Sequence, residues 1–223
     1  MNDEFIKNSD LELVGVKNDK AFIGFTSIHM DALKEVASIG SGNAVSSLSQ
    51  MTNKKIQMNV PEVNLLEFKD VGSSIAPADE MIVGILVSTS GDINGMVMFL
   101  LSLESARNIL NYIYETPINS EDGFSEMDIS SLQEVGNILI SSYISALGTL
   151  INKRIIPSVP VCAIDMAGAI LSVPAIEFGK IADGALHIET LFNSGDVNQV
   201  KGYFLLVPDL KSFNTIMKSL GVM

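Results

Sequence analysis

Apolar residues recur every three or four positions in two long stretches of this chain, which is the spacing of one buried face of an α-helix. The first predicted helix runs from about Ser27 to Met51, and the second contains residues 132–150. The buried stripe expected in the first helix comprises Leu33, Val36, Ala37, Gly40, Ala44, Leu48 and Met51. The stripe expected in the second comprises Leu132, Val135, Gly136, Leu139, Tyr143, Ala146, Leu147 and Leu150. Small residues on both stripes predict that each helix lies close on a sheet.

The two helical stretches are copies of one unit. Residues 31–61 align with residues 130–160 without a gap, and the offset is constant at 99 positions (134 − 35 for Glu35 and Glu134, 160 − 61 for Pro61 and Pro160). Each copy continues from the helix into a polar, basic link and a Val-Pro pair. An ungapped repeat of this length predicts one structural unit used twice.

The remaining pattern predicts the same element order in each half. Apolar runs predict strands at 62–68 and 81–88 in the first half, and at 161–171 and 185–191 in the second. A Ser-Gly-Asp turn then precedes a third strand, at 96–101 and at 202–207, and a helix closes each half at 102–114 and 209–220. Residues 115–128 are rich in turn-forming residues and predict a linker, and residues 1–26 predict an N-terminal hairpin extension.

We therefore expect an α+β fold with a pseudo-twofold internal repeat, in which two long equivalent helices pack on a shared β-sheet. The expected organisation is a single domain over 27–223, made of repeats at about 27–115 and 125–223.

The composition excludes some classes of binding partner. The 223 residues are 47% hydrophobic, with a mean hydropathy of +0.35, which is typical of a folded, core-rich protein. A formal net charge of −12 disfavours nucleic acid and anionic lipid as partners. The most apolar stretch, 159–176, is interrupted by Asp165, Gly168 and Pro174, which argues against membrane insertion. With no signal peptide evident and one cysteine, Cys162, expected in the core, we expect a cytoplasmic protein.

Opposite its buried stripe, each helix carries a narrow polar stripe. In the second helix Glu134, Asn137, Ser141 and Ser145 fall within about 80° of one another, and the first helix places Glu35, Ser38, Gly42 and Ser46 at the same positions. A Glu and an Asn three residues apart are most often a solvated helix face. Two features favour a function instead: the Glu recurs in the repeat, and Asn is a mediocre helix former that needs a reason at mid-helix.

Other candidate sites are weaker. Gly40-Ser-Gly42 lies within a predicted helix and lacks the context of a nucleotide loop. His29 and His187 are far apart in sequence and predict packing or surface roles, so we expect no metal site. Asp92 and Asp196 follow Ser-Gly and predict turns rather than metal ligands. No nucleophile elbow of a serine hydrolase is visible.

The motif Glu134-Val-Gly-Asn137-Ile-Leu, preceded by Ser-x-Leu and followed by Ser-Tyr-x-Ser-Ala-Leu, resembles the helix signature of the CheC/CheX/FliY phosphatases of bacterial chemotaxis. Glu35-Val-Ala-Ser38 resembles its first copy. The resemblance implies hydrolysis of the aspartyl phosphate on a CheY-type response regulator, with Mg²⁺ on the regulator and no cofactor on this chain. It implies that Asn137 orients the attacking water and that Glu134 contacts the regulator's lysine.

The first copy departs from the family pattern, since Ser38 stands where Asn is expected and Ala37 where Gly is usual. We therefore expect the Glu134/Asn137 site to dominate and the site of Glu35 to be weak. A non-catalytic role, as a binding partner of a CheD-type deamidase or of the regulator, remains an alternative. A flagellar switch component is a third reading, disfavoured because no switch-type domain follows.

Overall fold

The computed structural model describes residues 26–114, 123–178, 184–194 and 197–221. The hairpin predicted for residues 1–26 lies outside this range, apart from Thr26. The first half contains α2 (Ser27–Thr52), β1 (Gln57–Glu67), α3 (Phe68–Ile75), β2 (Met81–Gly91), β3 (Gly95–Ser102) and α4 (Leu103–Tyr114). The second contains α5 (Glu126–Ile151), β4 (Ile155–Pro157), β5 (Val161–Met166), α6 (Ala167–Phe178), β6 (Gly184–Ser194), β7 (Val197–Pro208) and α7 (Leu210–Ser219).

The two halves share one antiparallel sheet, as expected, and they interleave within it. The strand order is β1-β6-β7-β3-β2-β4, with β5 also paired to β2. Strands thus pair across the halves: β1 pairs with β6 of the second half, and β4 and β5 both pair with β2 of the first half. The central pair, β3 and β7, joins the halves. Neither half can complete its sheet alone, because each contributes an edge strand to the other.

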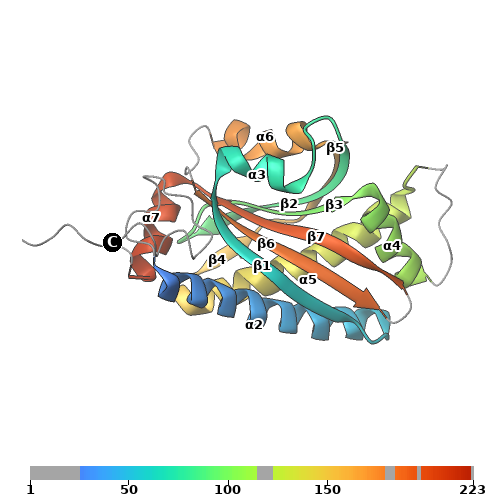
Figure 1. Cartoon of the computed structure of the whole chain (residues 1–223), viewed down its shortest axis with the longest axis horizontal. Helices are drawn as coiled ribbons and strands as arrows, with labels where there is room; N and C mark the ends of the chain where they lie inside the picture. The colour runs from blue at the N-terminus through green and yellow to red at the C-terminus, as the bar shows by residue number, and fades with distance from the viewer. Residues whose placement is uncertain (1–25, 115–122, 179–183, 195–196, 222–223) are drawn as a thin grey trace, which may run out of the picture.

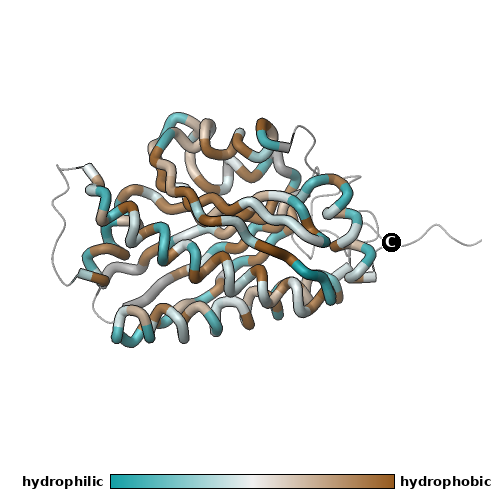
Figure 2. Tube along the Cα trace, turned by 180° about the vertical axis from the view of Figure 1, so that it is seen from behind, coloured by the Kyte–Doolittle hydropathy of each residue, from teal (hydrophilic) through white to brown (hydrophobic). Residues whose placement is uncertain are grey.

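Helices cover both faces of the sheet (Figure 1). Helices α2 and α5 lie side by side on one face, and α3 and α6 cover the other. The core side chains divide accordingly into two clusters, with Val83, Ile85 and Val87 of β2 facing α5 and with Ile82 and Leu86 facing α3 and α6. Because both faces are buried, the central strands β2 and β3 are nearly continuous apolar runs, and the middle of the sheet is strongly hydrophobic (Figure 2).

The small residues of the helix stripes serve two different contacts. Gly136 of α5 lies against Ile85 of the sheet, as predicted, since a Cβ there would come within 2.7 Å of its side chain. Gly40 of α2 instead lies against the other helix, because a Cβ at Gly40 would sit 2.5 Å from Cδ1 of Tyr143. Gly40 therefore allows α2 to approach α5 closely, and it does not face the sheet.

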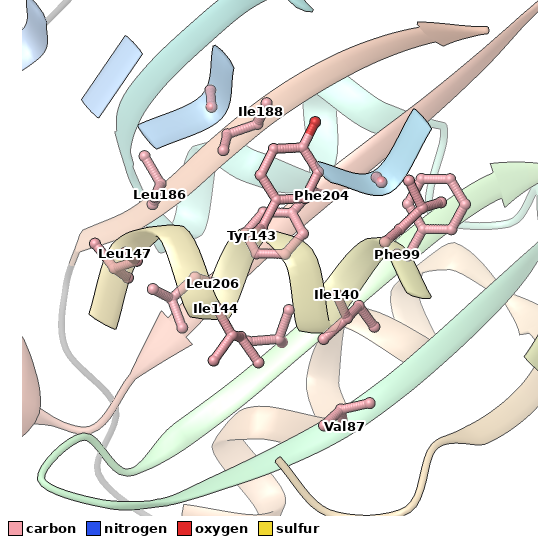
Figure 3. Packing of buried hydrophobic residues seen from close by; sticks show 14 of the residues in the cluster. Val87, Phe99, Ile140, Tyr143, Ile144, Leu147, Leu186, Ile188, Phe204 and Leu206 are labelled. Atoms are coloured by element: carbon pink, nitrogen blue, oxygen red, sulfur yellow. The ribbon is translucent and has the colours of Figure 1, made fainter. Parts of the chain in front are cut away.

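Tyr143 is the largest fully buried side chain at this crossing (Figure 3). Its ring centroid lies 4.7 Å from that of Phe204, and its hydroxyl lies 3.3 Å from Oγ1 of Thr190. Burial raises the pKa of Tyr143 to about 12. The phenol therefore stays neutral and ties α5 to β6 beneath α2.

Local signals set both ends of the long helices. Asn53 and Asn152 end α2 and α5 in the left-handed conformation, with φ of 52° and 51°. At the start of α5, Ser125 and Asp128 form a reciprocal capping box. The predicted linker 115–128 is therefore too long, because its last residues begin the helix.

The structure differs from the sequence predictions in further elements and residues. The apolar run 161–171 is not one strand, since β5 ends at Met166 and α6 follows directly. Helix α3 was likewise not predicted, because both helices are short and the apolar content of α6 resembles a buried strand. Met51 and Leu150, expected in the buried stripes, are 41% and 42% exposed, and in the last turn of α5 Ile151 is the buried residue instead.

Among the described helices, α5 is long and apolar enough, by length and composition, to cross a membrane. Half of its apolar stretch is buried inside the protein, against the sheet and α2. Packing in the core thus accounts for its composition.

His187 on β6 gives this fold a pH-sensitive stability. It is 2% exposed, neither ring nitrogen has a hydrogen-bond partner in the described part of the chain, and the ring stacks on Tyr203 at 5.5 Å. Burial lowers the pKa of His187, opposed by Glu62 and Glu189 and reinforced by Lys201.

A histidine whose folded-state pKa is lowered binds fewer protons in the native state than in the unfolded state, so stability should fall as the pH drops below about 6.5. Urea unfolding between pH 7.5 and 5.5 should show a loss of at most about 1.4 kcal/mol per pH unit from this group. His187→Leu should flatten that dependence. An equally steep dependence in the variant would show that other groups cause it.

Candidate functional site

The structure presents the second polar stripe on one accessible side of α5. Glu134 is exposed and Asn137 is half-buried, and the two lie one helical turn apart. Residues three apart on a helix are surface neighbours, with Cβ atoms about 5–6 Å apart. A carboxylate and a carboxamide are therefore available together to an incoming molecule, as the sequence predicted.

Both functional groups are uncommitted within the described residues. Neither the Glu134 carboxylate nor the Asn137 carboxamide forms a hydrogen bond or ion pair with another described side chain or backbone group. The neighbouring Ser142, by contrast, donates to the carbonyl of Ile138 at 2.7 Å. Since a carboxamide both donates and accepts, Asn137 keeps its full capacity to hold a water molecule in a fixed orientation.

The equivalent stripe on α2 is also exposed but chemically poorer. Glu35 and Ser38 are both exposed, and Gly42 continues the stripe with open space above it. Lys34 lies next to Glu35 and pairs with Asp31 at 3.8 Å. The first site thus has the carboxylate but only a short hydroxyl where the second has the carboxamide.

The two stripes form separate surfaces. Glu134 precedes Tyr143 by nine residues, which places them on opposite sides of α5, about 180° apart. Glu35 precedes Gly40 by five residues, about 140° around α2. Because Gly40 and Tyr143 mark the contact between the helices, both stripes face away from it. Each can engage a partner independently.

The weaker sequence candidates have structural explanations. The Asp92 carboxylate accepts a hydrogen bond from the backbone N–H of Arg154 at 2.9 Å and so stabilises a turn. Asp196 lies outside the described residues. Gly40 and Gly42 are inside α2, and His29 belongs to the N-terminal capping box of that helix.

Cys162 is half-buried, and burial raises the pKa of its thiol, which disfavours a reactive thiolate. In the described ranges no group of three or more His, Cys, Asp or Glu residues could hold a metal ion.

One polar contact beside the second site was missed from the sequence. Gln133, the residue before Glu134, donates from its side chain to the carbonyl of Pro160 at 3.1 Å. The Val-Pro pair after each helix was visible in the sequence, but its spacing along the chain does not place it beside the site.

Comparisons with known proteins agree on the family. Residues 28–65 and 127–163, which contain the two helix copies, match the CheC-like family. The chain is 32% identical over 203 residues to the CheY-P phosphatase CheC of Bacillus subtilis, covering 90% of this chain and 97% of that protein. It is 25% identical over 195 residues to the putative CheY-P phosphatase CheC1 of Halobacterium salinarum, covering 86% and 95%.

A solved structure supports the fold. The crystal structure of FliY from Thermotoga maritima matches with a TM-score of 0.70 at 18% identity, covering 88% of this chain and 98% of that one.

Proposed function

This chain belongs to the CheC-like family, and we propose that it hydrolyses the aspartyl phosphate of a CheY-type response regulator in chemotaxis signalling. The observation that carries the proposal is the carboxylate–carboxamide pair, Glu134 and Asn137, on an accessible side of α5, where neither group has a partner among the described residues. The 32% identity to a CheY-P phosphatase over nearly its whole length supports the same substrate.

In the proposed mechanism, Asn137 and Glu134 act by positioning the reacting groups. Hydrolysis of an acyl phosphate needs a water in line with the bond that breaks, and the regulator supplies Mg²⁺ and a lysine around its own phosphoryl group. The side-chain oxygen of Asn137 accepts a hydrogen bond from the water and its NH2 group donates one to an oxygen nearby, which fixes the water without a change in the protonation of Asn137. Glu134 forms a charge-assisted hydrogen bond to the regulator's lysine and so sets the register of the helix. We expect this reaction in the cytoplasm.

We assign the weaker role to the first site. The Ser38 hydroxyl is shorter than a carboxamide and lacks its second donor, so a water held there is less constrained. Glu35 retains the capacity for a lysine contact and supports binding more than hydrolysis.

Loss of the aspartyl phosphate from a phosphorylated regulator, followed with and without the purified chain, tests this function. The wild-type chain should shorten the phosphoryl lifetime, and the Glu134→Ala/Asn137→Ala double variant should lose most of the acceleration. An Ile176→Ser variant, altered on the opposite face of the sheet where the side chain is 77% exposed, is the matched control. An unchanged lifetime with wild-type protein would leave a binding role, with the regulator or with a CheD-type deamidase.

A further inference from the structure

An open groove lies at the end of α5, where the chain leaves the helix and turns toward β4. It has a volume of about 530 Å³. Its largely polar walls come from α5 and the adjoining turns, and they include Asp92, Ser145, Gly148, Thr149, Lys153 and Arg154. Three of these side chains are charged, so the groove is suited to binding a charged group.

The groove lies on the same side of α5 as Asn137. Ile144, which also lines it, follows Asn137 by seven residues (144 − 137), and Gly148 follows by eleven (148 − 137). Both positions are within about 20° of Asn137 around the helix, and they lie about 10 Å and about 17 Å from it along the axis. The groove thus continues the line of the carboxamide toward the end of the helix.

A protein docked over Asn137 would also reach the groove. A stable protein–protein interface buries about 800 Å² on each partner, which corresponds to a disc about 16 Å in radius. The near wall of the groove, at Ile144, is about 10 Å from Asn137 and falls inside that area. The partner that meets the carboxamide therefore meets the groove as well.

The two cations of the groove have no partner in the described ranges. The Lys153 side chain is half-buried and that of Arg154 is exposed, and neither forms a hydrogen bond or an ion pair with another residue of those ranges. The Asp92 carboxylate accepts the backbone N–H of Arg154 at 2.9 Å instead. Two cations and one anion give the groove a formal charge of +1, on a chain whose net charge is −12.

The end of α5 is closed without these cations. The backbone N–H of Asn152 donates to the carbonyl of Thr149 at 3.3 Å, and that of Lys153 donates to the carbonyl of Gly148 at 2.9 Å. Backbone groups therefore satisfy the last carbonyls of the helix, and capping does not require the two cationic side chains.

The equivalent lysine of the first half has a structural role. Lys54 corresponds to Lys153 at the offset of 99 (153 − 54), and its ammonium donates to the carbonyls of Tyr112 and Ile113 near the end of α4. It also lies 4.9 Å from the centroid of the Tyr112 ring. The first half thus uses this lysine in its fold, whereas the second half presents it on the side of the carboxamide.

Resting on the proposed function, we propose that Lys153 and Arg154 bind acidic side chains on the surface of the response regulator. Glu134 then pairs with a cation of the regulator, and the groove pairs with anions further along the same interface. Contacts of opposite sign fix the orientation in which the regulator docks, because a reversed approach would place like charges together. Since the acidic chain repels an acidic partner at long range, the two cations also favour approach to this side of α5.

Binding measured at two salt concentrations tests the groove. With the regulator held in its activated form by beryllofluoride and Mg²⁺, calorimetry at about 0.05 M salt should give a Kd at least about tenfold higher for Lys153→Glu/Arg154→Glu than for wild type. At about 0.5 M salt the ratio should fall below about threefold, because screening weakens ion pairs near the surface. On phosphorylated regulator at low salt, KM should rise by a similar factor and kcat should stay unchanged, because Asn137 is intact.

Lys55→Glu is the matched control. Lys55 is exposed and holds the place of Arg154 in the first half (154 − 55 = 99), so Lys55→Glu and Arg154→Glu change the net charge equally. Arg154→Glu should raise the Kd at low salt about three- to fivefold, and Lys55→Glu should raise it less than about 1.5-fold. An equal rise for both variants, a ratio that persists at high salt, or an unchanged Kd in the double variant would overturn the proposal.

The phosphatase assignment is decided separately. If the wild-type chain binds the regulator without shortening its phosphoryl lifetime, that assignment fails while the Kd values still decide the groove. If the wild-type chain does not bind the activated regulator, both proposals fall. Circular dichroism shows whether each variant is folded, and Arg154→Glu, at an exposed position, carries the test if the double variant does not fold.

Discussion

Replacing Asn137 by alanine will reduce the acceleration of aspartyl-phosphate loss about 100-fold, while Ser38→Ala will change it less than about twofold. The reason is that only Asn137 offers a donor and an acceptor fixed on one planar group, beside an exposed carboxylate. The measurement is the first-order decay of phosphorylated regulator at saturating concentrations of each variant, which reports kcat rather than binding.

Two controls sharpen that prediction. Asn137→Gln keeps the carboxamide but displaces it by one methylene, and it should recover little of the activity because position is what matters. Ser38→Asn restores the expected residue on α2 and should raise the activity that remains in an Asn137→Ala background. If Asn137→Ala is silent and Glu35→Ala abolishes the activity, the assignment of the dominant site is reversed.

Gly40→Ala will destabilise the protein by about 2 kcal/mol, although alanine is the better helix former. The added Cβ would sit 2.5 Å from Cδ1 and 3.1 Å from Cα of Tyr143. The ring cannot withdraw, because it is buried against Phe204 and its hydroxyl contacts Thr190. The two helices must separate instead, which opens the core between them and the sheet.

Gly42, two residues further along α2, is the matched control. A Cβ there meets nothing within 4 Å, so Gly42→Ala should stabilise the protein by about 0.5–1 kcal/mol. Thermal unfolding should therefore move in opposite directions for the two variants. Combining Gly40→Ala with Tyr143→Leu should cost less than the sum of the single changes, since the clash is removed. A gain of stability in both glycine variants would show that helix propensity, and not the contact between the helices, decides the effect at Gly40.

The sequence predicted the elements whose signals are local or repeated. The 3.6-residue spacing of apolar residues gave α2 and α5, because each needs one continuous buried stripe. The ungapped repeat indicated that Glu35 and Glu134 are equivalent. The short helices α3 and α6 were missed because their apolar content serves a sheet buried on both faces, and strand and helix then look alike in a short run.

The residues of the candidate site also fall into those that the sequence could predict and those that it could not. Glu134 and Asn137 were identifiable because two residues on one helical turn need no tertiary information to be neighbours. The contact of Gln133 with the Pro160 carbonyl was not identifiable, because it depends on the return of the chain along α5. That contact joins residues 27 apart, and no local pattern encodes it.

By itself the sequence determined which residues form the two long helices, which polar pair α5 displays, and that the second copy is the chemically complete one. Those properties follow from periodicity and residue type along one element. Only the tertiary structure decided that the halves exchange edge strands, that Gly40 meets Tyr143, and that Gln133 beside the second site binds the Pro160 carbonyl. Such contacts depend on side-chain volume and on the path of the backbone through space. No local sequence pattern indicates which residues distant in the chain will meet.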